Sequence, residues 1–479
     1  MKESFWVVVV VSGLLGVGCA GRAYTPSGNA LADVADAKLN PRVRIEAIPA
    51  AVRQSDGNES LMSATYLALD KIAWDPMEHP SLRSGAIRAL FEAGGDTTLR
   101  AKDTARRLLP KERSREVVLT ICEAASAGGW HEFEGAILRS YVRPVKGVED
   151  KDRAERAALA RLRPGMEVPR IAFDVFASGT VTEERLDAWD VVHRFDPTGT
   201  ARRAWLTGFS REGDEIIAAM DAARRDLRAM PRSSKEVQWL LTIRQDPKSG
   251  SWWREATQAA ALVPAGETLE LRHAESLRWA SRNQPAWLSK TRSDLIEELR
   301  GRLRGREFFS RTVETQDRRP RDRLEQIEPR LAWGDVLQAL VLDSVIRSPG
   351  VPDALLRQAE LDRKDSTTEY GGVIEAVGTA VKVVLHMPRP SERAGDSTFV
   401  ASPEMIAAST YSLAHFHFHA QNWRQQEYAG PSPQDLEYAA RYGRACVVLT
   451  AVREGELGVD YYQPEGVVVD LGTIRSGGN

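Results

Sequence analysis

The chain has 479 residues, with 65 basic and 67 acidic side chains and a formal net charge of −2. This balance argues against a nucleic-acid partner and against a polybasic membrane contact. With 28% charged and 42% hydrophobic residues, the composition is that of a folded protein rather than a disordered chain. The length predicts roughly two to four domains.

The N-terminus carries an apolar run that follows Lys2 and extends from Phe5 to Gly18, with few interruptions. Its length is that of a signal-peptide core and is too short for a transmembrane helix. The run ends at Gly18-Cys19-Ala20-Gly21, which resembles the lipobox of bacterial lipoproteins. The resemblance implies that residues 1–19 hold a signal peptide and that Cys19 is the lipidation site. The protein is then exported and anchored to a membrane of the bacterial cell envelope. Ordinary secretion and an uncleaved anchor are the alternatives.

The two other cysteines, Cys122 and Cys446, both lie in apolar runs. A free cysteine in such a setting behaves as a small core hydrophobe. We therefore expect two buried thiols rather than a disulfide or a pair of metal ligands.

An internal repeat follows a polar linker. Residues 41–50 and 80–89 align at an offset of 39 and share Pro, Arg, Ala, Ile and Ala. Residues 114–119 form a weaker third copy. This spacing resembles that of HEAT repeats, whose period is about 40–47 residues. Each such unit is a helix pair that buries its apolar face by stacking on its neighbours. Residues 30–148 are therefore predicted to form HEAT-like repeats; a non-repetitive helical bundle is the alternative.

Residues 149–350 are predicted to be α-helical, because apolar residues recur at spacings of three and four. The predicted helices are Asp152–Leu162, Glu183–Val192, Asp214–Met230, Ser234–Ile243, Glu267–Ala280, Ser293–Arg304 and Trp333–Ile346. Val168–Phe176 is consistent with a strand or a short helix. Many tryptophans lie between Trp130 and Trp333, and packing is favoured over a binding surface for them.

The pattern changes after about Lys364. Strands are predicted near 371–374, 380–385, 445–450, 458–462 and 467–471, with another strand through the histidines near residue 417. Helices are predicted after Ser402, a typical N-cap followed by proline, and from Pro433 to Tyr442. The alternation predicts a C-terminal α/β or α+β domain over residues 355–475, which is an ordinary domain size.

Three of the eight histidines, His415, His417 and His419, fall within five residues. Alternate side chains of a strand point to the same face, so the three imidazoles would share one face. Two imidazoles and a carboxylate from the next helix can bind a metal and leave one position for water. Either His415 and His417 or His417 and His419 could be the pair. We prefer the second pair because it shortens the reach to Asp435, and His415 is then a neighbour of the site.

Three motifs in this part of the chain form a larger pattern. Glu369-Tyr370-Gly371-Gly372, His417-Phe418-His419 and Ser432-Pro433-Gln434-Asp435, in this order, resemble the signature of the JAMM (JAB/MPN) metalloprotease family. The resemblance covers residues 355–475, about a quarter of the chain. It implies a JAMM-like, cytidine-deaminase-like α/β fold. It also implies that His417, His419 and Asp435 bind Zn²⁺, that Glu369 is the general base and acid, and that Ser432 stabilises the oxyanion.

The sequence departs from the family at two places. The family usually has a small hydroxyl residue between the histidines and a proline after the second, where this chain has Phe418 and Ala420. The segment 420–431 is also longer than usual. Each motif also has an ordinary structural interpretation; Ser432-x-x-Asp435 alone is typical of a helix cap.

Two functions follow as hypotheses. The first is an exported, lipid-anchored zinc metallohydrolase that cleaves a peptide or isopeptide-type amide, with the helical repeats as a scaffold for a protein or peptide substrate. The second is a non-catalytic interaction scaffold of the envelope with a degenerate JAMM-like domain. The sequence does not predict the oligomeric state.

Overall fold

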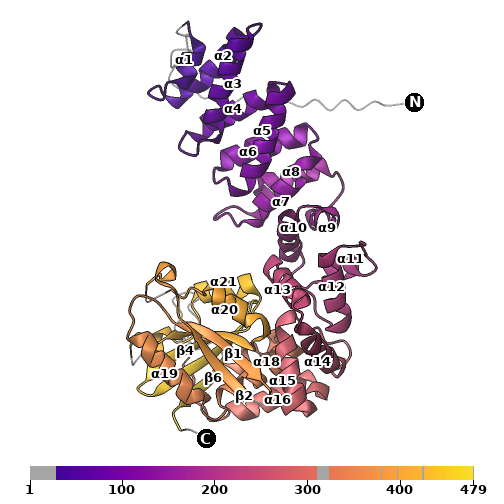
Figure 1. Ribbon diagram of the computed structural model, residues 1–479, viewed down its shortest axis with the longest axis vertical. Helices are drawn as coiled ribbons and strands as arrows, with labels where there is room; N and C mark the ends of the chain where they lie inside the picture. The colour runs from indigo at the N-terminus through magenta and orange to yellow at the C-terminus, as the bar shows by residue number, and fades with distance from the viewer. Residues whose placement is uncertain (1–27, 310–322, 379, 396–397, 423–424, 478–479) are drawn as a thin grey trace, which may run out of the picture. The chain divides into compact units, whose positions relative to one another are not determined.

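The computed structural model describes residues 28–309, 323–378, 380–395, 398–422 and 425–477. The predicted signal peptide and Cys19 lie outside these ranges. The chain divides into two compact units, Met1–Gly165 and Met166–Asn479. Helices make up the first unit and the first half of the second, and a six-stranded mixed sheet lies in the C-terminal part (Figure 1). This agrees with the predicted order of a helical region followed by an α/β domain. No helix among the described residues is long and apolar enough to cross a membrane.

The first unit is a series of helices that pack in pairs. Its α-helices are α1 (Ala30–Ala35), α2 (Pro41–Ser55), α3 (Glu59–Trp74), α4 (Pro80–Glu92), α5 (Gly95–Leu108), α6 (Arg115–Ala127), α7 (Glu134–Val142) and α8 (Ala154–Leu162). Helices α2, α4, α6 and α8 pack one on the next. The stack includes α8, so this unit continues past residue 148 to Gly165.

The sequence repeat is also a repeat of side-chain contacts. Arg44 and Arg83 lie 39 positions apart and are both buried. The Nε of each donates to a carbonyl of the helix before, at 2.9 and 3.2 Å. Each guanidinium also pairs with a glutamate that precedes the next helix of the stack: Arg44 of α2 with Glu78 before α4 at 2.8 Å, and Arg83 of α4 with Glu112 before α6 at 2.5 Å. Each arginine therefore ties its own helix to the helix before it and to the start of the next stacked helix, which explains its recurrence.

The second unit begins with a long run of helices, of which α14 to α19 contribute to one hydrophobic core. They are α9 (Val168–Ser178), α10 (Thr182–Phe195), α11 (Thr200–Leu206), α12 (Glu215–Asp226), α13 (Ser234–Gln245), α14 (Ser249–Ala261), α15 (Ala274–Asn283), α16 (Arg292–Leu303), α17 (Leu324–Ile327), α18 (Trp333–Ile346) and α19 (Val351–Arg363). The ambiguous stretch Val168–Phe176 is thus a helix. Most tryptophans of this region are buried, as expected for packing, including Trp189 and Trp333.

The sheet has the order β2-β1-β3-β4-β5-β6. Its strands are β1 (Gly371–Val377), β2 (Ala380–His386), β3 (Ala414–His419), β4 (Cys446–Arg453), β5 (Glu456–Tyr462) and β6 (Val468–Arg475). Strands β3 and β4 are parallel, and the other neighbours are antiparallel. Two further helices, α20 (Pro403–Ala408) and α21 (Pro433–Tyr442), flank β3 in the chain.

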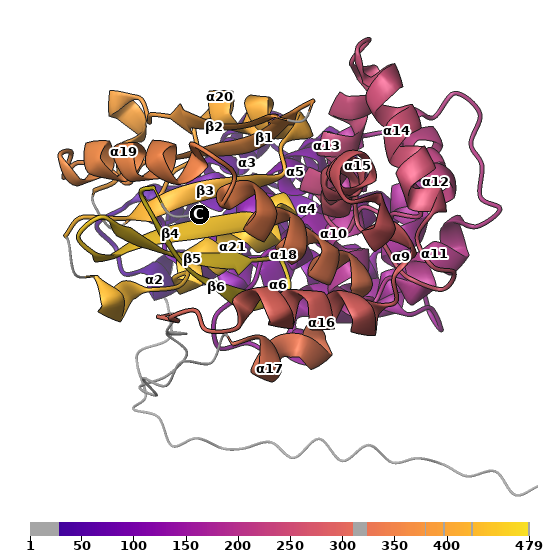
Figure 2. The ribbon, with the colours of Figure 1, turned by 90° about the horizontal axis from the view of Figure 1, so that it is seen from below.

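The two faces of the sheet pack against different helices. On one face, Phe416 and Phe418 join a large core with helix α18, in which every residue except Ser344 is buried. Burial on all sides is typical of a central core helix. Figure 2 shows α18 and α19 lying against the strands. On the other face, Cys446 and Val448 pack with α21. The histidines of β3 alternate with the phenylalanines and therefore lie on the α21 face.

Both described cysteines, Cys122 and Cys446, are free and buried, as predicted. The core that holds α18 contains residues from Ala259 to Ile474. The middle helices and the sheet therefore share one hydrophobic core.

Candidate metal centre

The pairing of β1 with β3 places a glutamate beside two histidines. The two strands are antiparallel, with Gly371 opposite His417. Phe418 N donates to the carbonyl of Tyr370, which continues this register past the end of β1. Glu369 precedes Gly371 by two residues, so it lies opposite His419, which follows His417 by two. Strand pairing therefore brings Glu369 and the two histidines, which are far apart in the sequence, close together in space.

The two glycines of β1 are required by close packing rather than by an unusual backbone conformation. A Cβ at Gly371 would lie 2.3 Å from the ring of Phe399 and 2.5 Å from the carbonyl oxygen of Phe416. A Cβ at Gly372 would lie 2.0 Å from the carbonyl oxygen of Val384. Phe399 in turn stacks on the His417 imidazole, with ring centroids 5.0 Å apart and planes at 14°. The absence of a side chain at Gly371 therefore makes room for the ring that covers His417.

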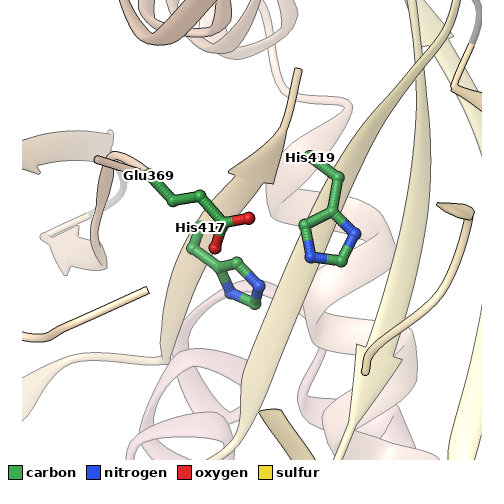
Figure 3. Close-up of side chains that lie close together, drawn as sticks. All are labelled: Glu369, His417 and His419. Carbon is green, nitrogen blue, oxygen red and sulfur yellow. The ribbon is translucent and has the colours of Figure 1, made fainter. Parts of the chain in front are cut away.

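Three side chains gather at one place, and a fourth lies against the two imidazoles. One ligand atom each from Glu369, His417 and His419 lie within 4.8 Å of one another. Figure 3 shows these three side chains pointing toward one another. Asp435 approaches from α21, with Oδ1 at 3.2 Å from His417 Nε2 and Oδ2 at 3.6 Å from His419 Nε2. All four are buried, with exposed fractions of 4% for Glu369, 1% for His417, 9% for His419 and 6% for Asp435.

The Ser432-x-x-Asp435 motif forms a helix cap and also places Asp435 at the candidate metal centre. Ser432 is the N-cap of α21; its Oγ accepts from Asp435 N at 3.2 Å, and its own N donates to Asp435 Oδ2 at 2.7 Å. This is a complete capping box. The same contacts orient the Asp435 carboxylate toward the imidazoles. Cap and metal ligand are therefore compatible roles for this residue.

Contacts at the far ring nitrogens orient both histidines. His419 Nδ1 lies 3.0 Å from the carbonyl oxygen of Tyr428. A carbonyl only accepts, so Nδ1 carries the proton and neutral His419 presents the lone pair of Nε2 to Asp435. His417 Nδ1 lies 3.4 Å from the hydroxyl of Tyr462. Such outer partners fix the tautomer and ring orientation of metal-binding histidines.

The third histidine of the strand lies outside this group. His415 Nδ1 contacts the Tyr438 hydroxyl at 2.7 Å, and the ring is fully buried behind α21. Because Glu369 gathers with His417 and His419, the structure favours this pair over the alternative with His415.

The charges of the group are strongly coupled. Burial would raise the pKa of Asp435, but the positive charge that His417 and His419 carry when protonated holds it well below the ordinary value. Burial would lower the pKa of His419, but Asp435 and Glu369 raise it above its usual range. Burial raises the pKa of Glu369, although both imidazoles oppose this. Two carboxylates thus face two imidazoles, an arrangement that needs positive charge at its centre.

The donor set fits a divalent metal ion. Two imidazoles with one or two carboxylates are ligands that Zn²⁺ and Fe²⁺ both accept. His417 Nε2 is buried and has no well-aligned hydrogen bond among the described residues, although Asp435 lies close. A lone pair of His419 Nε2 directed at a carboxylate is unfavourable unless a proton or a metal cation lies between them. A metal ion meets both requirements.

Three contributors to the site were not predicted from the sequence. Phe399 stacks on His417, Gln421 Nε2 donates to Glu369 Oε1 at 3.1 Å, and the Tyr428 carbonyl holds His419. Of these three, only Gln421 has a signal in the sequence, because it lies two residues after His419.

No protein-family model, curated protein or solved structure matches the chain.

Proposed function

We propose that the chain is a zinc-dependent hydrolase that cleaves peptide or isopeptide-type amide bonds, and that its C-terminal part is a JAMM-like domain. One observation carries the proposal. Glu369, His417, His419 and Asp435 come from three separate stretches in the order of the family signature, and in the fold Glu369 gathers with the two histidines while Asp435 contacts both imidazoles. Each motif alone has an ordinary structural explanation, but their convergence does not follow from those explanations.

The proposed roles follow from the positions of the side chains. His417, His419 and Asp435 hold the zinc ion, which when bound lowers the pKa of a water molecule to about 7 and makes it a nucleophile. Glu369 takes a proton from the attacking water and delivers it to the leaving amine nitrogen. Its burial raises its pKa and so favours the proton-carrying state. Ser432 Oγ already accepts from Asp435 N, so its hydroxyl proton is free to donate to the developing oxyanion.

The rest of the chain supports a location and a partner class. The apolar N-terminal run that ends at Cys19 supports export and a lipid anchor in the bacterial envelope. The repeated helix pairs of the first unit, with their matched Arg44 and Arg83, support a HEAT-like scaffold for a protein or peptide substrate or partner.

A non-catalytic scaffold is the second candidate. It is favoured by the burial of all four site residues, of which His419 is the most exposed at 9%. In that case the metal is a structural element that ties β1, β3 and α21 together.

An assay on defined peptides separates the two functions. The purified chain is incubated with peptides joined through α-amides and through lysine ε-amides, before and after chelation. The proposal predicts cleavage that stops on chelation and returns with Zn²⁺. Cleavage that persists without metal, or a protein that is isolated with iron and no zinc, would contradict it. No cleavage by a zinc-loaded protein would favour the scaffold.

A further inference from the structure

The segment between His419 and Ser432 departs most from the resembled family, yet it contributes to the metal centre. Gln421 Nε2 donates to Glu369 Oε1 at 3.1 Å, and the Tyr428 carbonyl lies 3.0 Å from His419 Nδ1. The two contacts come from opposite ends of the segment. They reach the proposed base and one proposed ligand.

The described residues on the two sides of positions 423 and 424 are held by different strands. Gln425 N donates to the carbonyl of Ala451 at 2.9 Å, and Gln426 Nε2 donates to the carbonyl of Val452 at 3.1 Å, so residues 425 and 426 are held against β4. Gln421 lies two residues after His419, the last residue of β3, and the strand therefore sets the backbone position from which Gln421 presents its amide.

Glu369 needs such a partner. It lies just before β1, so the ladder of β1 does not hold its backbone on both sides. Its side chain has three rotatable bonds, and ordering a glutamate side chain costs conformational entropy. A hydrogen bond from a neutral amide to a carboxylate is stronger than a bond between two neutral groups. By engaging Oε1, Gln421 selects one orientation of the carboxylate and leaves Oε2 for proton transfer.

We propose that Gln421 is a positioning residue that holds the Glu369 carboxylate in the metal centre. The inference rests on the proposed function for its catalytic consequence, but the contact itself does not. Gln421 and Tyr428 are then built parts of the centre rather than signs of its degeneration.

A double-mutant cycle of Gln421→Met and Glu369→Ala tests this role, with Gln245→Met as the matched control, because Gln245 Nε2 donates to Glu215 Oε2 at 3.3 Å at an exposed position on α13. Methionine preserves side-chain length and removes the amide donor. On the best-cleaved peptide, Gln421→Met is expected to lower kcat about tenfold with KM and zinc content unchanged. In the Glu369→Ala background the same change should have an effect under about twofold, because the group that it positions is gone. An equal loss in both backgrounds, or no loss, would overturn the inference.

The melting temperatures of the four metal-free proteins give a readout that does not depend on activity. Non-additive shifts for Gln421→Met and Glu369→Ala support the positioning contact, and additive shifts overturn it. Gln245→Met should add independently to Glu369→Ala. If the wild type cleaves none of the peptides, the proposed function fails, and this cycle alone decides the Gln421 inference.

Discussion

The Glu369→Gln variant is expected to keep its zinc and to hydrolyse its substrate about 10²–10⁴-fold more slowly than the wild type, the usual contribution of general acid–base catalysis. Glutamine has the shape of glutamate but cannot accept and return a proton at this position. The three proposed ligands, His417, His419 and Asp435, are unchanged. The measurements are kcat/KM and the zinc content of the same preparation.

The same variant also separates two assignments of the carboxylates. Glu369 lies within 4.8 Å of the ligand atoms of His417 and His419, so it is close enough to serve as a third ligand itself. Loss of zinc together with activity would assign Glu369 as a ligand and contradict its role as base. Glu375→Gln, on strand β1 but away from the histidines, is the control and should retain both zinc and activity.

Replacing Arg272 by methionine is expected to destabilise the second unit by about 3–5 kcal/mol, the cost of breaking a buried ion pair on one side. The guanidinium joins the middle helices to the sheet. It donates to Glu270 at 2.9 Å, to Asp335 at 2.6 Å, and to Tyr461 and Gln463 at 3.1 Å each. Chemical denaturation followed by tryptophan fluorescence measures the effect.

The size of this effect comes from the carboxylates that would be left behind. Burial would raise the pKa of Asp335, but Arg272 and His273 hold it well below its ordinary value. Burial would also raise the pKa of Glu270, but Arg272 and Arg232 lower it to about 2. Both acids are therefore ionised at neutral pH, and the methionine would leave this charge without its main partner. Neighbouring apolar atoms cannot replace that interaction.

Arg225→Met is the matched control for Arg272→Met. Arg225 pairs with Asp221 at 3.0 Å on the surface, where the two side chains are 62% and 34% exposed. Such pairs contribute about 0.2–1 kcal/mol. A loss below about 1 kcal/mol for Arg272→Met would show that the network does not hold the unit together.

Regular elements with clear end signals were predicted closely. Helix α18 has the predicted bounds Trp333–Ile346, and α21 runs from Pro433 to Tyr442 as predicted. Val168–Ser178 could not be assigned from its short apolar run, because periodicity does not separate a buried strand from a buried helix at that length.

Two predicted helices were too long for a tertiary reason. The helix predicted over Asp214–Met230 ends at Asp226, because Arg228 has a φ of 54°. Its guanidinium donates to the carbonyls of Val263, Pro264 and Glu267, all in a loop more than thirty residues away. The helix predicted from Glu267 likewise begins later, at Ala274. Local periodicity contains no information about such distant partners.

The same distinction applies to the metal centre. Side chains with a characteristic identity and spacing, such as His417, His419 and Asp435, could be proposed from the sequence. The carbonyl of Tyr428 could not, because every residue has a carbonyl and only the fold selects one. The buried network around Arg272 was missed for a similar reason, since its partners are far apart in the chain.

Metal analysis of the purified wild type beside Asp435→Ala tests the central claim most directly. We expect about one zinc ion per wild-type chain and less than about a tenth of that in the variant, because a ligand is lost. Glu437→Ala, an exposed position on the same helix, is the control and should bind zinc as the wild type does. Circular dichroism establishes that both variants are folded. A wild type without stoichiometric zinc, or a folded Asp435→Ala protein that retains it, would contradict the account.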